Sequence, residues 1–209
     1  MRTVAILSTL VLASAASLIA AAPQTAAKAP AAAAPAAGAQ TFTVDGVHSK
    51  ALFRVHHLNA GQFWGRFNDV SGTFTANEGN PEGMSFDITI KVDSVDTGNE
   101  KLDAHLKSPD FFNAKENPTL AFKSTGVKKG PKDGWLEVTG DLTMNGVTKP
   151  VTAMVEFTGS ADGPQGRKAG YEAIFSVKRS DWNIKYGVDQ KMLGDDVRII
   201  VALEGNLKK

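Results

Sequence analysis

The 209-residue sequence contains no cysteine. Disulfide bonds, thiolate catalysis, cysteine-based metal sites and lipid attachment to an N-terminal cysteine are therefore excluded, so stability must come from the core and the sheet. A strong charge of one sign is also missing. Of the 23 basic and 22 acidic residues, only Arg2 and Lys28 precede residue 41, which leaves 21 basic and 22 acidic residues in the rest of the chain. This balance argues against nucleic-acid binding through a general basic surface.

Catalytic signatures are also scarce. The sequence has no Gly-x-Ser-x-Gly turn and no glycine-rich phosphate loop. Of the four histidines, His56 and His57 are adjacent in an expected strand and point to opposite faces. A metal or hydrolytic site would require His57, His105 and Asp103 to meet in space, whereas a histidine bonded to backbone or carboxylate is the structural alternative. We predict no catalytic residue, no metal and no required cofactor.

The first 40 residues have the composition of a leader and a spacer. Arg2 precedes an uncharged apolar run over residues 4–20, and small residues follow up to Ala22, which is typical of a signal peptide. We assign residues 1–22 to it, with cleavage between residues 15 and 22 and export to the periplasm or the medium. A retained membrane anchor is the alternative. The Ala- and Pro-rich residues 23–40 form an expected disordered tether, and residues 41–209 an expected single domain.

Apolar and polar residues alternate over most of this domain, as in half-buried β-strands. In residues 85–92, for example, Phe86, Ile88 and Ile90 share one face. Asn145-Gly146 predicts a tight hairpin turn. The expected strands cover residues 41–44, 51–57, 65–76, 85–92, 119–127, 135–144, 147–158, 170–178 and 197–205. With no βαβ rhythm, this pattern predicts an all-β antiparallel barrel of about eight strands, whose interior holds either its own side chains or one small ligand.

One polar, helix-capable insert interrupts the strands near residues 97–108. Thr97 and Glu100 have the spacing of a capping box, and Pro109 is expected to end the helix. Leu102 and Leu106 share one helical face. The insert is either a surface loop with a short helix or a lid over a cavity.

Two polar pairs are expected to be structural. Asp103 and Lys107 are four residues apart and can pair on the helix. For Arg179 we expect an ion pair with Asp181 or Asp69 and no catalytic role.

Five sequence blocks, in order, resemble one known family. They are SKALFRVHHL (49–58), GRFNDVSGTF (65–74), SVDTGNEKLDAHLKSPDFF (94–112), GDLTMNGVTKPV (140–151) and KRSDW (178–182). Together they resemble the YceI-like family of exported polyisoprenoid-binding proteins, although Trp182 stands where the family usually has Phe. The resemblance implies a lipocalin-like extended antiparallel β-barrel with an apolar tunnel that holds an isoprenoid chain, such as a quinone tail or a polyprenyl lipid. It implies a carrier or reservoir in the periplasm or outside the cell.

Alternation and the matched blocks together nominate the residues that line this tunnel. The predicted lipid-binding residues are Phe53, Val55, Phe67, Phe74, Phe86, Ile88, Ile90, Leu106, Phe111, Phe112, Phe122, Leu142, Val155, Phe175, Val177, Trp182, Ile199 and Val201. Near the insert, the candidates for binding a head group are His105, Asp103 and Lys107. Because this set contains both acidic and basic groups, we expect the head group to be neutral. The same apolar residues could instead fill a solid core.

The expected partners follow from this reading. They are an isoprenoid lipid, bound by a monomer or homodimer with transient membrane contact, and no nucleic acid. Two other functions stay open: an enzyme that acts on a prenyl lipid or quinone through His105 and Asp103, and a structural or stress-protective envelope protein.

Overall fold

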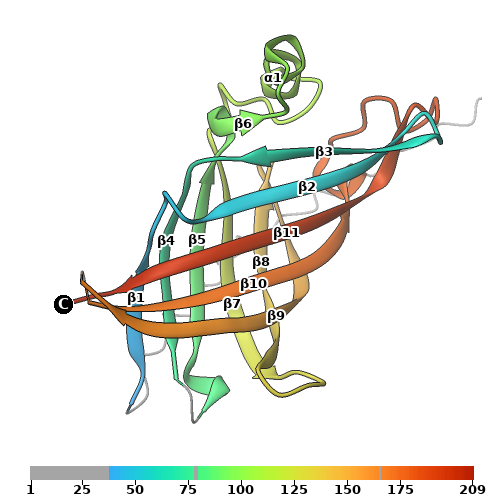
Figure 1. Cartoon of the computed structure of the whole chain (residues 1–209). Coiled ribbons are helices and arrows are strands. Elements are labelled where there is room, and N and C mark those ends of the chain that lie inside the picture. Colours follow the sequence, from blue (N-terminus) through green and yellow to red (C-terminus); the bar gives the residue numbers. More distant parts are fainter. Residues whose placement is uncertain (1–37, 78–79, 165) are drawn as a thin grey trace, which may run out of the picture. The chain divides into compact units, whose positions relative to one another are not determined.

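Residues 38–77, 80–164 and 166–209 are described by a computed structural model (Figure 1). The predicted signal peptide, residues 1–22, and nearly all of the predicted tether lie outside these residues. Gln40, which we assigned to the tether, is already the first residue of a strand.

Eleven antiparallel strands account for most of the described chain. They are β1 (Gln40–Val44), β2 (Lys50–His57), β3 (Gly61–Phe67), β4 (Val70–Ala76), β5 (Ser85–Lys91), β6 (Val95–Asp96), β7 (Thr119–Lys129), β8 (Trp135–Met144), β9 (Val147–Gly163), β10 (Gly166–Lys178) and β11 (Leu193–Leu207). The helical elements are α1 (Glu100–Lys107) and the short 3-10 turns η1 (Pro81–Gly83), η2 (Val92–Ser94) and η3 (Arg179–Trp182). None of the described helices is long and apolar enough to span a bilayer.

The sheet closes into a barrel of eight strands in the order β1-β4-β5-β7-β8-β9-β10-β11, because β1 also pairs with β11. Along one edge of β11, the segment from Leu193 to Ala202 pairs with β2, and the segment from Gly205 to Leu207 pairs with β1. β2 then continues through β3 to the short strand β6. The predicted all-β antiparallel barrel is confirmed, with one extension that the sequence analysis did not include.

Local signals explain most strand boundaries. The Asn145-Gly146 turn has the positive φ values expected of a tight hairpin, 48° and 74°, and joins β8 to β9. The predicted single strand over residues 65–76 is wrong, because the chain breaks it into β3 and β4 at Asn68 and Asp69. There the backbone amides of Asn68 and Asp69 donate to the carbonyl and hydroxyl oxygens of Ser94, at 3.1 and 3.0 Å.

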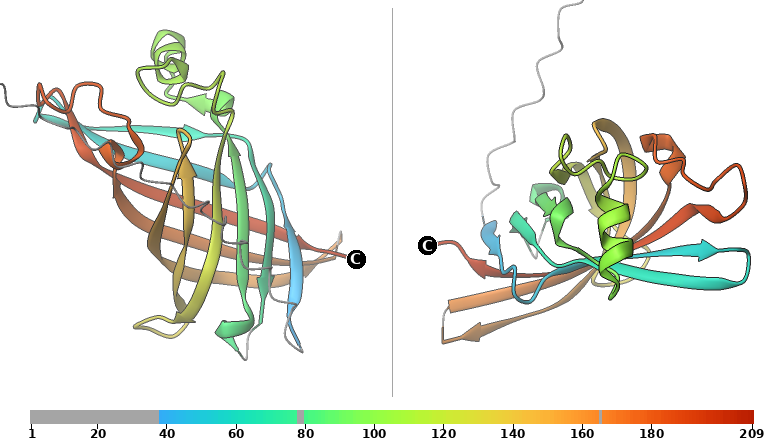
Figure 2. Two further views of the ribbon diagram at one scale, coloured as in Figure 1. Left: turned by 180° about the vertical axis from the view of Figure 1, so that it is seen from behind. Right: turned by 90° about the horizontal axis from the view of Figure 1, so that it is seen from above.

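The helical insert forms α1, which lies across one end of the barrel (Figures 1 and 2). Its N-cap is Asn99, whose side chain accepts from the amides of Lys101 and Leu102. Thr97, the predicted cap, instead donates through its amide and hydroxyl to Asp103, at 2.8 and 2.7 Å. The expected Asp103–Lys107 pair is therefore wrong, since Asp103 is turned back toward the segment before the helix.

Aromatic rings fill the opposite end of the barrel. Phe42 stacks on Phe74 at 5.2 Å between ring centroids, and Tyr171 meets Phe74, Phe86 and Phe157 at 5.3, 5.5 and 5.4 Å. We call these five side chains the aromatic plug. Stacked and edge-to-face contacts at these distances are the favoured arrangements of aromatic rings, and Phe42, Phe74, Phe86 and Tyr171 are all buried, so the plug fills this end of the barrel.

Candidate functional site

A cavity of about 730 Å³ occupies the barrel between the aromatic plug and α1. Its wall is made by side chains from β2, β3, β5 and β7–β11, together with α1 and the residues after it and the segment between η3 and β11. Among the described lining residues there is no aspartate, glutamate or lysine, and the ionisable groups are His57, His105, Arg179 and two tyrosines. Such a volume is typical of small-molecule sites, which lie between about 300 and 1,000 Å³.

Nearly all of the side chains nominated from the sequence face this cavity. The nominated residues that line it are Phe53, Val55, Phe67, Phe86, Ile88, Ile90, Leu106, Phe111, Phe112, Phe122, Leu142, Val155, Phe175, Val177, Ile199 and Val201. Those in strands converge because alternate residues of a strand point to the same face, whereas Leu106, Phe111 and Phe112 reach the cavity from α1 and the turns after it. Contact with a lipid stays a prediction for each of them.

Phe74 and Trp182 do not line the cavity. Phe74 is 1% exposed and belongs to the aromatic plug. Trp182 is buried in η3, where its indole N–H donates to the carbonyl of Leu142 at 3.1 Å. A buried indole needs such an acceptor, so Trp182 fastens η3 to β8 and its ring is not available at the tunnel end.

Several lining residues were not among those nominated from the sequence. Phe63 lies in the part of β3 that precedes the predicted strand, and Leu102 faces the cavity from α1. Ile184, Tyr186 and Met192 come from the irregular segment before β11, where no periodicity indicates direction. Only Leu102 had been assigned a direction, through its shared helical face with Leu106.

The mouth of the cavity lies at α1, the β2–β3 hairpin and the segment of residues 184–192, which we call the mouth loop. Tyr186 and Met192 line the cavity, yet each is 41% exposed. The hairpin is tied to the mouth loop by the Leu58 amide, which donates to the Met192 carbonyl at 2.8 Å. The lining is thus continuous from the interior to the surface.

His105 is the one head-group candidate on the cavity wall. Its ring meets Phe111 and Tyr186 edge to face at 5.0 and 4.9 Å, and Nε2 lies 3.0 Å from an Asp110 carboxylate oxygen. Asp103 and Lys107 are not among the lining residues. The pairing of His105 with Asp103 that an enzymatic site required is therefore not formed.

Arg179 is a buried guanidinium at the base of the mouth loop, and it is 6% exposed. It donates to four backbone carbonyls, those of Gly194 (2.8 Å), Ile184 (3.1 Å), Tyr186 (2.8 Å) and Leu193 (3.2 Å). Burial lowers the pKa of Arg179, and the charge of Asp195 opposes that shift. The guanidinium therefore shapes the mouth loop by satisfying its carbonyls.

The ion pairs predicted for Arg179 are wrong. The Asp181 carboxylate instead pairs with the Lys149 ammonium, at 3.5 Å, and the Asp69 carboxylate pairs with the Lys91 ammonium, at 2.7 Å. Turn η3 ends the strand before residue 181, so Arg179 and Asp181 do not share the strand face on which the prediction depended.

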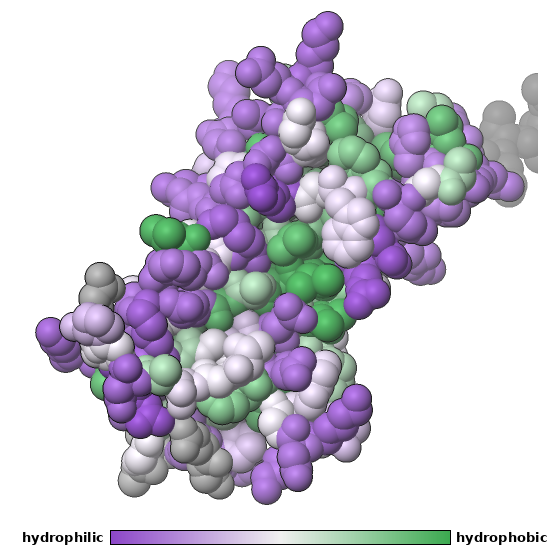
Figure 3. Space-filling model, viewed as in Figure 1, coloured by the Kyte–Doolittle hydropathy of each residue, from purple (hydrophilic) through white to green (hydrophobic). Residues whose placement is uncertain are grey.

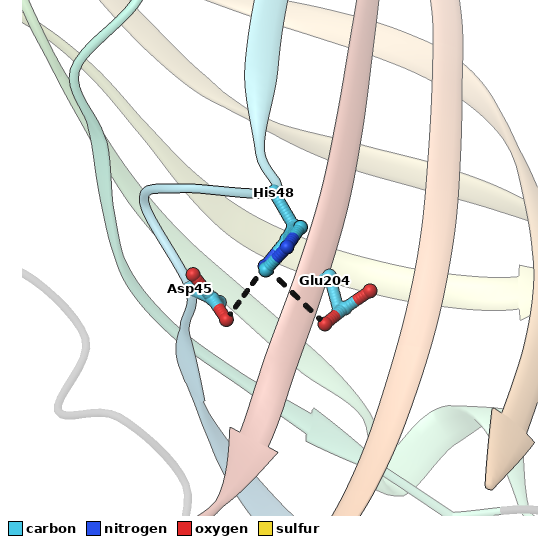
Figure 4. Close-up of side chains that lie close together, drawn as sticks. All are labelled: Asp45, His48 and Glu204. Carbon is cyan, nitrogen blue, oxygen red and sulfur yellow. Dashed lines mark hydrogen bonds and ion pairs between the residues drawn. The ribbon is translucent and has the colours of Figure 1, made fainter.

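A second polar cluster lies outside the barrel, at the turn between β1 and β2 (Figure 4). Among the described residues, one group of three offers a histidine nitrogen and carboxylate oxygens, atoms that can bind a metal ion, all within 4.8 Å of one another. It consists of Asp45, His48 and Glu204. The Lys168 ammonium already contacts Glu204 at 2.6 Å and Asp45 at 3.4 Å. The hydrogen bond with His48 is the main cause that lowers the pKa of Asp45 far below its usual range. This cluster fastens the turn to β11 and has no contact with the cavity.

Comparison with known proteins identifies the family. The model of the YceI-like domain matches residues 42–205. Protein YceI of Escherichia coli O17:K52:H18 (strain UMN026 / ExPEC) is 42% identical over 166 residues, which cover 79% of this chain and 85% of that protein. The chain belongs to the YceI-like family.

Two solved structures are similar to this YceI-like barrel. The YCEI protein of Campylobacter jejuni has a TM-score of 0.62 and 32% identity, and the match covers 69% of this chain and 84% of that chain. A polyisoprenoid binding domain from Saccharophagus degradans, implicated in plant cell wall breakdown, has a TM-score of 0.62 over 81% of this chain and 99% of its own. At 12% identity, the second match supports the YceI-like fold alone.

Proposed function

We propose that this YceI-like protein is an exported lipid-binding protein that holds an isoprenoid chain in its barrel as a carrier or reservoir. The observation that carries the proposal is the cavity of about 730 Å³ whose wall is almost entirely hydrocarbon. Transfer of apolar surface from water to such a wall gives about 25 cal/mol per Å², so a branched hydrocarbon needs no ionic anchor to bind.

The polar groups at the mouth favour a neutral head group. No lysine or acidic residue is among the described lining residues, and the Arg179 guanidinium is already engaged by four carbonyls. His105 is the available hydrogen-bonding side chain on α1, and its Nε2 is near Asp110. A quinone or alcohol head group can be accommodated by such a group, whereas a phosphate would lack cationic partners.

The isoprenoid class is supported by the neighbouring fold rather than by a group that recognises methyl branches. The Saccharophagus degradans domain is described as polyisoprenoid binding. In the present chain, the wall is made of aliphatic and aromatic side chains such as Ile88, Ile199 and Phe175. Export rests on the predicted signal peptide.

The carrier role is supported by the exposed apolar rim of the mouth. Leu58 is 57% exposed, and Tyr186 and Met192 are each 41% exposed beside the opening. A water-insoluble chain has to enter from a bilayer or another carrier, and an apolar rim lowers the cost of that transfer. Transient membrane contact through this rim follows from the proposal.

The experiment is to purify the exported protein, extract it with organic solvent and identify the extract by mass spectrometry. Ala173→Trp places an indole inside the cavity, since Ala173 lines it, and the matched variant Ala161→Trp places the same group on an exposed position of β9. We expect an isoprenoid in the wild type and in Ala161→Trp but not in Ala173→Trp. An empty wild-type protein, or equal loading of both variants, would contradict the proposal.

A further inference from the structure

A second pocket lies behind the aromatic plug, on the side away from the cavity. Its volume is about 260 Å³, against about 730 Å³ for the cavity. The cavity wall is almost entirely hydrocarbon, whereas the described residues around the second pocket include the polar side chains of Gln40, Ser160 and Arg167. Hydrophilic residues also gather on the outside of the barrel end that carries the C-terminus (Figure 3, left). The plug therefore separates an apolar space from a polar one.

Tyr171 is the one described residue that lines both of these spaces. Its side chain is buried, and it lies on β10 between two inward-facing alanines. Ala173 borders the cavity on one side of it, and Ala169 borders the second pocket on the other. Because both alanines are small, the Tyr171 ring is the bulk that β10 places between the two spaces. A chain that runs along β10 from the cavity meets this ring before it reaches the second pocket.

The contact between Tyr171 and Phe86 spans the barrel. β10 and β5 are four strands apart in both directions round the closed ring of eight, so they form opposite walls. The two rings meet edge to face, at 5.5 Å between centroids and an interplanar angle of 88°. Phe86 borders the cavity as well. Together the two rings close the cross-section of the barrel at the floor of the cavity.

We infer that the Tyr171 ring sets the length of the hydrocarbon chain that the barrel accepts, an inference that rests on the proposed function. A chain that enters at the mouth, beside α1, runs toward the plug and ends against this ring. Burial of a further isoprene unit needs more apolar space, and the ring occupies that space. Units beyond this length stay in water, so they add nothing to the affinity.

Removal of the ring is expected to join the two spaces. Tyr171→Ala leaves alanine at every inward position of β10 from Ala169 to Ala173. The cavity then continues past Phe86 to the apolar inner wall of the second pocket, which includes Phe157. A longer chain can bury its end there, so the upper limit of length should increase by about one isoprene unit.

Competition among chain lengths tests this assignment. The delipidated protein is incubated with an equimolar mixture of prenyl alcohols that differ by one isoprene unit, and native mass spectrometry reports the lengths that it retains. We expect the wild type to show an upper limit, and Tyr171→Ala to retain the first alcohol beyond that limit at least about tenfold more than the wild type does. Tyr171→Phe returns the ring and should return the limit, and Tyr171→Leu should give an intermediate limit.

Phe157→Ala is the matched control, because it removes a ring of the plug that borders the second pocket and leaves Tyr171 in place. Its limit should equal that of the wild type. Circular dichroism shows whether each variant is folded, and Tyr171→Leu supplies the test if Tyr171→Ala is not.

The outcomes separate this inference from the proposed function. A wild type that retains no prenyl alcohol would overturn the proposed function and this inference with it. A loaded wild type whose limit is unchanged in the folded Tyr171 variants would overturn this inference alone. The same conclusion would follow if Phe157→Ala moved the limit as far as Tyr171→Ala.

Discussion

The two ends of the barrel are built from the same kind of strand, yet one is filled and the other is hollow. At the filled end, β1 lies between β4 and β11 and brings Phe42 against Phe74, within the five rings of the aromatic plug. At the hollow end, β2, β3 and β6 extend the sheet beyond the closed ring, and α1 and the mouth loop cover the opening. Phe42 and Phe74 are thus fully buried within the plug, whereas rings such as Phe175 border the cavity on one side.

Truncation of one ring at each end gives the largest expected contrast. Phe74→Ala should lower the free energy of unfolding by about 3–5 kcal/mol, because it leaves a void in a packed cluster. Phe175→Ala should cost less than about 2 kcal/mol, because that half-buried ring already borders the cavity and lacks neighbours on one side. Urea unfolding of the ligand-free proteins measures both. Equal costs would mean that the two ends are packed alike.

The mouth loop depends on one buried cation, and its removal should have the next largest effect. Arg179→Met keeps the apolar volume but leaves four carbonyls without their donor, at a cost of about 2–4 kcal/mol. We expect limited proteolysis to cut the variant within residues 184–194. Lys185→Met, at an exposed position of the same loop, is the control and should resist the protease like the wild type.

Adding side-chain atoms, instead of removing them, should also destabilise the filled end more than the hollow end. A Cβ at Gly205 would lie 2.6 Å from the Phe74 ring and 2.9 Å from Phe42, so Gly205→Ala should destabilise the barrel by about 1–3 kcal/mol. Ala173→Leu adds more volume but extends into the cavity and should change stability by less than about 1 kcal/mol. Thermal unfolding of the two variants checks this order, and a larger loss in Ala173→Leu would contradict it.

The cluster outside the barrel should show a smaller effect that depends on pH. Folding lowers the pKa of Asp45, mainly through the hydrogen bond with His48, so the charged carboxylate stabilises the folded state. This contribution is present above the ordinary aspartate pKa of 3.8 and is lost as the pH falls toward the lower folded value. Asp45→Asn should therefore make stability less dependent on pH below about 4. Chemical unfolding at pH 3 and pH 6 measures the change, and an unaltered pH dependence would assign the acid sensitivity to other groups.

The strands were predictable from the sequence because inward and outward residues alternate with a period of two. The same period identified most of the cavity wall, since facing the barrel axis is a property of a single strand. It did not distinguish Phe74 from Phe175, because a plug depends on whether rings from distant strands meet. The roles of Arg179 and Trp182 were also missed, because both act through backbone carbonyls, which leave no pattern in the sequence.

The central claim is that the hollow end takes up hydrocarbon because of its volume and apolar wall. The most direct test is to titrate the delipidated protein with prenyl alcohols of increasing length and to measure each dissociation constant by isothermal titration calorimetry. Affinity should rise with each added unit, at up to about 0.8 kcal/mol per buried CH₂, and level off once the cavity of about 730 Å³ is full. An affinity that does not depend on chain length would contradict the account.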